Sequence, residues 1–186
     1  MAKQYDALND ALGDFLLGQH IFFTASATAN SRVNLTPRES GALRILDAKT
    51  VCYLDRTGSG NETAAHMRAD GRLTIMTCAL NGPPQILRLY GRGESLFWDT
   101  PDFATLIAQH YGEAPLGTRQ IVRLHIDLVQ TSCGYGVPVF DYRGERSAME
   151  NWHANKGPEG IRDWWRETNQ TSIDGLPTGL NVPGEG

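Results

Sequence analysis

Residues 51–76, VCYLDRTGSGNETAAHMRADGRLTIM, contain in order the patterns of a strand, a tight turn, a short helix and a second strand. The apolar run over 49–55 predicts a buried strand, and the glycine-rich stretch within 56–60 predicts a turn. A short helix is expected over 61–70, followed by an alternating strand over 73–78. The chain lacks a regular alternation of strands and long helices, which favours an antiparallel β structure over a doubly wound sheet.

Strand patterns continue on both sides of this stretch. Further strands are expected over residues 20–28, 32–36, 85–98 and 119–129. Pro37 is expected to end the second of these strands, and Gly91 and Gly93 to bend the third. Helices are expected over residues 4–18, 99–111, 144–155 and 159–169, the last one packed through Trp164 and Trp165. Together these patterns predict a mainly β fold, an antiparallel barrel with peripheral helices.

The composition is that of a globular chain. It has 186 residues, of which 40% are hydrophobic and 20% charged, and a net charge of −4 that leaves no basic field for nucleic acid. No stretch approaches the roughly 18–20 apolar residues of a membrane-spanning helix, and the N-terminus lacks a signal-peptide pattern. Cys52, Cys78 and Cys133 form no metal-binding cluster. We therefore expect a soluble cytoplasmic protein with free thiols, no metal and no membrane contact.

The turn at Gly58-Ser59-Gly60 is the first candidate binding site. Its glycines free the backbone to present N–H groups, and the helix that follows adds the positive end of its dipole. Ser59 and Thr63 offer hydroxyl groups, so these donors can hold a phosphate. The same residues also form a capping box, Ser59-x-x-Glu62, in which Glu62 satisfies the helix N–H groups itself. The residues alone favour the cap.

Two further segments place polar side chains near the ends of strands. The stretch RVNLTPR offers the amide of Asn34, the hydroxyl of Thr36 and the guanidinium of Arg38. Such groups can contact the edge of a flavin ring or pair with a phosphate, although a solvated edge strand is the simpler interpretation. Gln130 and Thr131 lie where the long alternating strand ends, and the character of the chain changes soon after them.

Several strings of residues, in this order and spacing, resemble the pyridoxamine-5′-phosphate-oxidase-like family of FMN-binding split barrels. They are HIFFTASA (20–27), RVNLTPRESGALRIL (32–46), residues 51–76, GPPQILRLYGRGE (82–94), SCGYGVPVFDYRGER (132–146) and SIDGLP (172–177). The resemblance implies a six-stranded antiparallel split β-barrel that forms a homodimer, with FMN in a cleft at the subunit interface. We expect the FMN-binding split-barrel domain with its N-terminal helix over 1–140, and a C-terminal helical extension and tail over 141–186.

The resemblance also implies which residues bind the cofactor. In the oxidases, a strand matching Val33 to Arg38 contacts the flavin, and a Gln-Ser pair matches Gln130-Thr131. Glu62-Thr63 stand where the oxidases carry a basic pair for the phosphate, so backbone N–H groups, the Thr63 hydroxyl and Arg38 would hold the phosphate instead. The expected cofactor-binding set is Val33, Asn34, Leu35, Thr36, Arg38, Ser59, Gly60, Asn61, Glu62, Thr63, Arg88, Gln130 and Thr131.

The function that the resemblance implies is that of an FMN-dependent oxidoreductase acting on a small molecule. No catalytic side chain can be named, so the flavin itself is expected to carry the chemistry. The C-terminal pattern with which the oxidases bind vitamin B6 has no clear match in this chain. Three alternatives stay open: a non-catalytic flavin- or haem-binding module, an F420-dependent reductase, and a structural dimer without a functional cleft.

Overall fold

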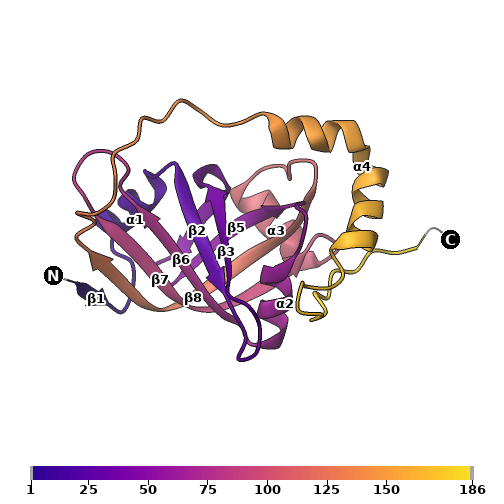
Figure 1. The fold of residues 1–186 in the computed structure, drawn as a ribbon, viewed down its shortest axis with the longest axis horizontal. Helices are drawn as coiled ribbons and strands as arrows, with labels where there is room; N and C mark the ends of the chain where they lie inside the picture. Colours follow the sequence, from indigo (N-terminus) through magenta and orange to yellow (C-terminus); the bar gives the residue numbers. More distant parts are fainter. Residues whose placement is uncertain (1, 185–186) are drawn as a thin grey trace.

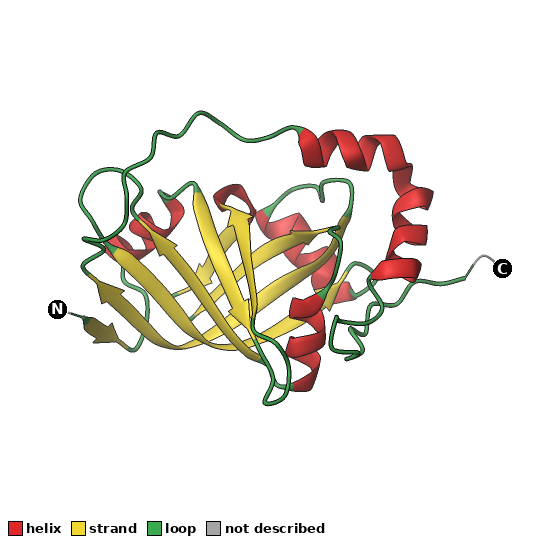
Figure 2. Cartoon of the chain, viewed as in Figure 1, coloured by secondary structure: helices red, strands yellow, loops and turns green. Residues whose placement is uncertain are grey.

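The computed structural model describes residues 2–184, apart from the side chain of Ser40, and its strands form a curled antiparallel sheet (Figures 1 and 2). The strands are β1 (Lys3–Tyr5), β2 (Ile21–Ser26), β3 (Asn34–Glu39), β4 (Leu43–Asp47), β5 (Thr50–Arg56), β6 (Arg72–Cys78), β7 (Ile86–Phe97) and β8 (Thr118–Ser132). The helices are α1 (Asp10–Leu17), α2 (Glu62–Ala69), α3 (Pro101–His110), α4 (Ala148–Thr168) and a short 3-10 helix at Ser40–Ala42.

The strands follow the order β3-β2-β6-β7-β8-β5-β4, and β1 pairs with β8. The mainly β split-barrel prediction is confirmed, and the six strands expected from the sequence are all present. The described residues contain eight strands rather than six, because β1 and β4 are added. β4 was missed because it is short and follows β3 after only a single helical turn, with no alternation to mark it.

The N-terminal helix is shorter than the periodicity predicts. It begins at Asp10 because the side chain of Asn9 accepts a hydrogen bond from the Leu12 N–H at 3.0 Å, which caps the first turn. Tyr5, counted in the predicted apolar stripe, lies in β1 instead and pairs with β8. Tertiary pairing therefore overrides the helical pattern at this end.

Proline and glycine have different consequences in the two strands where they were expected to act. β3 continues through Pro37, so the predicted end of this strand is wrong; β3 is an edge strand, where a missing N–H is tolerated. The bend predicted in β7 is confirmed by a register shift between Tyr90 and Gly91. A Cβ at Gly91 would lie 1.9 Å from the carbonyl oxygen of His125, so the close approach of β8 requires glycine there.

Two apolar clusters hold the elements together. The larger one fills the barrel and extends under α1 and α3, which contribute Leu12, Leu16, Phe103 and Leu106. The smaller one consists of Ile161, Trp165 and Leu180 and joins α4 and the tail to the end of β7. α4 bends at Gly157, where φ is 67°, which confirms the two helices expected over this region.

Side chains, rather than backbone pairing, join β3 to β5 across the open side of the barrel. The Arg38 guanidinium forms an ion pair with Asp55 and lies 5.3 Å from the centre of the Tyr53 ring. This split between the two strands is where the candidate site lies. None of the helices in residues 2–184 is long and apolar enough to cross a membrane.

Candidate functional site

A cavity of about 630 Å3 opens at the split between β3 and β5. Its walls come from the inner side chains of β3, the turn 57–60, the start of α2 and the segment 168–173, which begins with the last residue of α4. Of the residues predicted to bind the cofactor, those that line the cavity are Asn34, Thr36, Arg38, Ser59, Gly60, Glu62 and Thr63. The structure thus brings together two segments that the sequence singled out separately.

Alternation along β3 decides which of its predicted residues face the cavity. Asn34, Thr36 and Arg38 lie opposite buried residues of β2 and therefore share the inner face of the sheet. Val33 and Leu35 are 73% and 64% exposed, so their side chains point away from the cavity. Only their backbone can contribute to a ligand site there.

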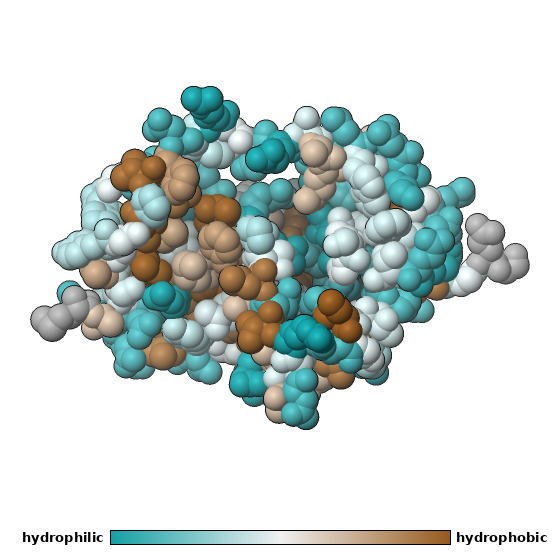
Figure 3. Space-filling view, in the orientation of Figure 1, coloured by the Kyte–Doolittle hydropathy of each residue, from teal (hydrophilic) through white to brown (hydrophobic). Residues whose placement is uncertain are grey.

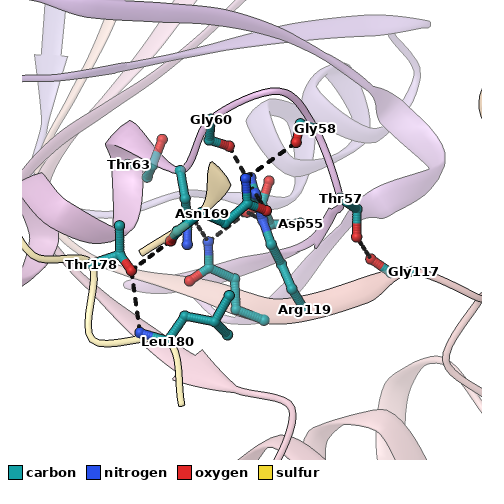
Figure 4. Close-up of polar contacts among 12 residues, drawn as sticks. Asp55, Thr57, Gly58, Gly60, Thr63, Gly117, Arg119, Asn169, Thr178 and Leu180 are labelled. Atoms are coloured by element: carbon teal, nitrogen blue, oxygen red, sulfur yellow. Dashed lines mark hydrogen bonds and ion pairs between the residues drawn. The ribbon is translucent and has the colours of Figure 1, made fainter. Parts of the chain in front are cut away.

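A buried carboxylate lies beneath the cavity at the end of β5. Asp55 is fully buried and accepts hydrogen bonds from Arg119 and Gln120 on β8, in addition to the ion pair with Arg38. Figure 4 shows Asp55 beside Arg119. Burial by itself raises the pKa of Asp55, but the guanidinium groups of Arg119 and Arg38 outweigh it and lower the pKa to about 2. Asp55 is therefore ionised, and it fixes the position of Arg38 in the cavity wall.

Arg119 extends this network to the glycine-rich turn. Its Nη1 donates to the carbonyl oxygen of Gly60 and to the side-chain oxygen of Asn169, each at 2.7 Å (Figure 4). Asn169 in turn donates to the carbonyl oxygen of Gly58 at 3.3 Å, and its own carbonyl oxygen accepts a hydrogen bond from Thr178 at 2.8 Å. The turn is thereby held from behind by β8, α4 and the tail.

The paired tryptophans of α4 hold the same turn. Trp164 donates its indole N–H to the carbonyl oxygen of Gly58 at 3.0 Å, and Trp165 donates to the Thr57 hydroxyl at 2.6 Å. Neither ring lines the cavity, as expected for packing residues. Because these contacts join residues 106 and 108 positions apart in the sequence, the shape of the turn depends on the C-terminal helix.

The predicted capping box does not form. α2 begins at Glu62, and within the described residues no side chain caps its first turn. The Glu62 carboxylate instead accepts the Ile173 N–H at 3.0 and 3.2 Å, and thus fixes the tail along the cavity. Asn61 is buried and accepts a hydrogen bond from Gln120 at 2.9 Å, so its side chain supports the turn rather than facing the cavity. The first N–H groups of α2 remain beside the cavity.

Two arginine side chains that line the cavity have N–H groups without a hydrogen-bond acceptor within residues 2–184. Arg56 lines it and is held by Glu150 at 2.6 Å and by His153 at 3.0 Å. Burial, and then the Arg56 guanidinium, lower the pKa of His153, so its imidazole stays neutral and accepts at Nδ1 near pH 7. Among the described side chains, the buried Nε atoms of Arg56 and Arg38 meet no acceptor. Both guanidinium groups belong to residues that line the cavity, so they favour an anionic group there.

A chain of polar side chains orients Asn34. Its amide nitrogen lies 3.1 Å from the Thr63 hydroxyl and 3.4 Å from the Ser26 hydroxyl, while its amide oxygen accepts from Thr36 at 3.1 Å. Ser26 lies 3.0 Å from Nδ1 of the buried His66. Both amide protons of Asn34 are thus directed inward, which leaves the second lone pair of its carbonyl oxygen for a ligand.

The remaining predicted residues lie elsewhere on the sheet. Arg88 and Gln130 are partners in the β7–β8 register, and both point to the outer face, where Arg88 donates to the Ser132 hydroxyl at 3.1 Å. Thr131 pairs with Leu87, which is fully buried, so Thr131 points to the opposite face from Gln130. None of these three predicted residues lines the cavity of its own chain.

Comparison with known proteins identifies the family. The family model described as "Pyridoxamine 5′-phosphate oxidase" matches residues 8–133. The chain belongs to the pyridoxamine 5′-phosphate oxidase family. It is 33% identical to "Pyridoxamine 5′-phosphate oxidase family protein ustO" of Aspergillus flavus, over 93% of this chain and 76% of that protein.

Two solved structures have a fold similar to this split barrel. HupZ of Group A Streptococcus has a TM-score of 0.52 at 16% identity, covering 65% of this chain and 92% of that one. A protein of Lactobacillus delbrueckii, described as a candidate pyridoxamine 5′-phosphate oxidase, has a TM-score of 0.53 at 16% identity. The match covers 67% of this chain and 94% of that one. At this identity the likeness shows the family fold alone.

Sequence reasoning missed the residues that organise the site. They are Asp55, Arg56, Arg119, Gln120 and the segment 168–173. A signal was present at Asp55-Arg56, because a charged pair that closes an otherwise apolar strand indicates a buried or functional charge. Arg119-Gln120 carried a weaker signal, since both stand at the start of a strand whose polar face was taken as exposed.

Proposed function

We propose that this family member binds FMN in the cavity between β3 and β5 and acts as an oxidoreductase on a small molecule. The observation that carries the proposal is the combination of two donor sets in one cavity. The positive charges of Arg38 and Arg56 and the uncapped start of α2 suit a phosphate, and the fixed carbonyl of Asn34 suits the edge of a heterocyclic ring. Membership of the family supports a flavin as the ligand.

The proposal assigns separate tasks to the two halves of the cavity. Arg56, Arg38, Ser59 and the backbone of the turn would hold the phosphate, while Asn34 and Thr36 would hold the ring. Glu62 stands beside this site, but its carboxylate is engaged by the Ile173 N–H. When bound, FMN supplies the capacity to accept or donate a hydride or single electrons; the protein positions it and excludes water from one side.

A homodimer would complete the site. Arg88 and Gln130 lie on the outer face of the sheet, beyond reach of their own cavity, and that face also carries half-buried apolar side chains such as Phe23, Met76 and Tyr90. Figure 3 shows apolar side chains spread over the β6 and β7 side of this view. A two-fold dimer through this face would bring each outer polar pair to the partner's cavity.

The free cysteines fit a reducing compartment such as the cytoplasm.

The first experiment is the visible spectrum of protein purified without added cofactor, with mass identification of the released molecule. The proposal predicts a yellow protein that releases a molecule with the mass of FMN. Release of haem or F420 would contradict it, as would a colourless protein whose melting temperature does not change when FMN is added.

The second experiment compares FMN with riboflavin, which lacks the phosphate. Arg56→Gln should weaken the affinity for FMN by roughly tenfold to a hundredfold, because one charge-assisted contact with the phosphate is lost. The affinity for riboflavin should change by no more than about twofold. Arg166→Gln is the matched control, since Arg166 pairs with Asp163 outside the cavity. Equal weakening of both ligands by Arg56→Gln would place the phosphate elsewhere.

A further inference from the structure

A second cavity adjoins the first one. It has a volume of about 610 Å3 and lies between the start of β2, the end of β3 and the segment 140–149. Pro37, Arg38, Glu39 and Met149 line both cavities. A molecule in the second cavity would therefore be separated from a ligand in the first by no more than one layer of side chains.

The walls of this second cavity are mostly apolar and aromatic. Ile21, Leu80, Phe140 and Met149 contribute apolar surface. The rings of His20 and Tyr142 stack in parallel, with 3.7 Å between their centres and 4° between their planes. Flat, stacked rings of this kind form a platform for another planar ring.

The segment that forms the outer wall exposes aromatic surface that a ligand would cover. Figure 1 shows residues 134–147 arching over the sheet, without regular secondary structure, between β8 and α4. The N–H of Phe140 donates to the carbonyl oxygen of Leu80, just after β6, at 2.8 Å, yet Phe140 is 57% exposed and Tyr142 48%. These two aromatic side chains are apolar surface that a molecule in the cavity would cover.

The charged side chains around the second cavity indicate which class of ligand it can bind. Three acidic and three basic side chains line this cavity, so their formal charges cancel. They are Asp141, Arg143, Glu145 and Arg146 on this segment, and Arg38 and Glu39 on β3. Glu145 is also engaged, because it accepts the Tyr142 hydroxyl at 2.9 Å. A cavity with apolar walls and a balanced rim favours a neutral molecule over an anion or a cation.

We propose that the second cavity binds the substrate of this protein, and that the substrate is an uncharged, planar, aromatic molecule. The substrate role rests on the proposed function, whereas the ligand class rests on the cavity alone. The match to the family model ends at residue 133, before the segment that forms the outer wall. The substrate class therefore depends on residues that lie outside the match to this family model.

The test uses 2-naphthol, a neutral two-ring probe, in equilibrium dialysis with the full chain saturated with FMN. Phe140→Ala and Tyr142→Ala should each weaken its binding by roughly fivefold to tenfold, because each removes an aromatic contact. Tyr135→Ala is the matched control on the same segment, since Tyr135 is 82% exposed and lies outside the cavity lining. It should leave the affinity unchanged.

Two outcomes would overturn the ligand class: 2-naphthol fails to bind the wild type, or Tyr135→Ala weakens it as much as Tyr142→Ala does. Flavin fluorescence in the same samples tests the substrate role, and it should be quenched saturably with the same apparent Kd. Naphthol binding without such quenching would refute the substrate role. Failure of FMN itself to bind, with naphthol binding intact, would refute the proposed function and leave the ligand class standing.

Discussion

The cavity between β3 and β5 and the outer face of β7 and β8 both carry polar side chains, but the two regions differ in how those side chains are held. In the cavity, Arg38 is fixed by the buried carboxylate of Asp55, which Arg119 and Gln120 also contact. On the outer face, Arg88 contacts a single hydroxyl, that of Ser132. A preorganised set of groups suits a ligand, whereas a loosely held set suits a surface that is completed by another molecule.

This contrast indicates that one chain supplies a rigid half of the proposed site. Substitutions in the cavity should cost stability as well as binding, whereas substitutions on the outer face should cost binding alone. The following predictions test this contrast.

The largest effect is expected for Asp55→Asn. The change leaves two buried guanidinium groups without a counter-charge, so the free energy of unfolding should fall by about 3–5 kcal/mol. Denaturant unfolding measures it. Glu94→Gln is the control, because Glu94 pairs with Arg123 and His125 at the surface, where such pairs contribute less than about 1 kcal/mol. Equal effects of the two substitutions would contradict the contrast.

The same carboxylate should make the stability of the protein depend on pH in the acid range. The pKa of Asp55 is about 2 in the folded protein against an ordinary value of 3.8, so the ionised form stabilises the fold. This contribution, about 2 kcal/mol, is fully present above about pH 4 and is lost as the pH falls towards 2. The difference in unfolding free energy between the wild type and Asp55→Asn should therefore shrink over that range. A constant difference would show that Asp55 is not the group that titrates.

A smaller effect is expected on the outer face. Arg88→Ala should weaken FMN binding by roughly tenfold, because a charge-assisted contact is lost, while the melting temperature stays within about 2 °C. Arg72→Ala is a control of the same type, since Arg72 lies exposed beside Asp70. A large loss of stability in Arg88→Ala, without loss of FMN, would make Arg88 a structural residue.

The smallest effect is expected for Glu62→Gln. The glutamine oxygen can still accept the Ile173 N–H, so the tail should stay in place, but a negative charge beside the proposed phosphate site disappears. FMN should bind about threefold tighter, and riboflavin should be unaffected. If both ligands instead bind more weakly, the carboxylate is itself a ligand of the ring.

The sequence predicted what depends on local patterns. Alternation gave the long strands, and Gly91 marked the bend in β7. The glycine-rich turn and the inner residues of β3 were also identified, and the structure brings them together in one cavity. These features follow from residues close to one another along the chain.

What could not be predicted depends on pairing between distant segments. Glu62 was assigned to a cap because its actual partner, Ile173, lies 111 positions away. The importance of Asp55 depends on the register between β5 and β8, which places Gln120 opposite it. The two faces of β8 likewise separate Gln130 from Thr131, although the two are neighbours in sequence.

A subunit-mixing titration tests whether two subunits share each FMN site. Arg56→Gln damages the cavity and Arg88→Ala damages the outer face, so neither variant alone should bind FMN tightly. If each site takes its cavity from one subunit and its outer residues from the partner, every mixed dimer regains one intact site, and random mixing restores about one quarter of the wild-type tight sites. A mixture that exchanges subunits but restores no tight FMN binding would contradict the shared site.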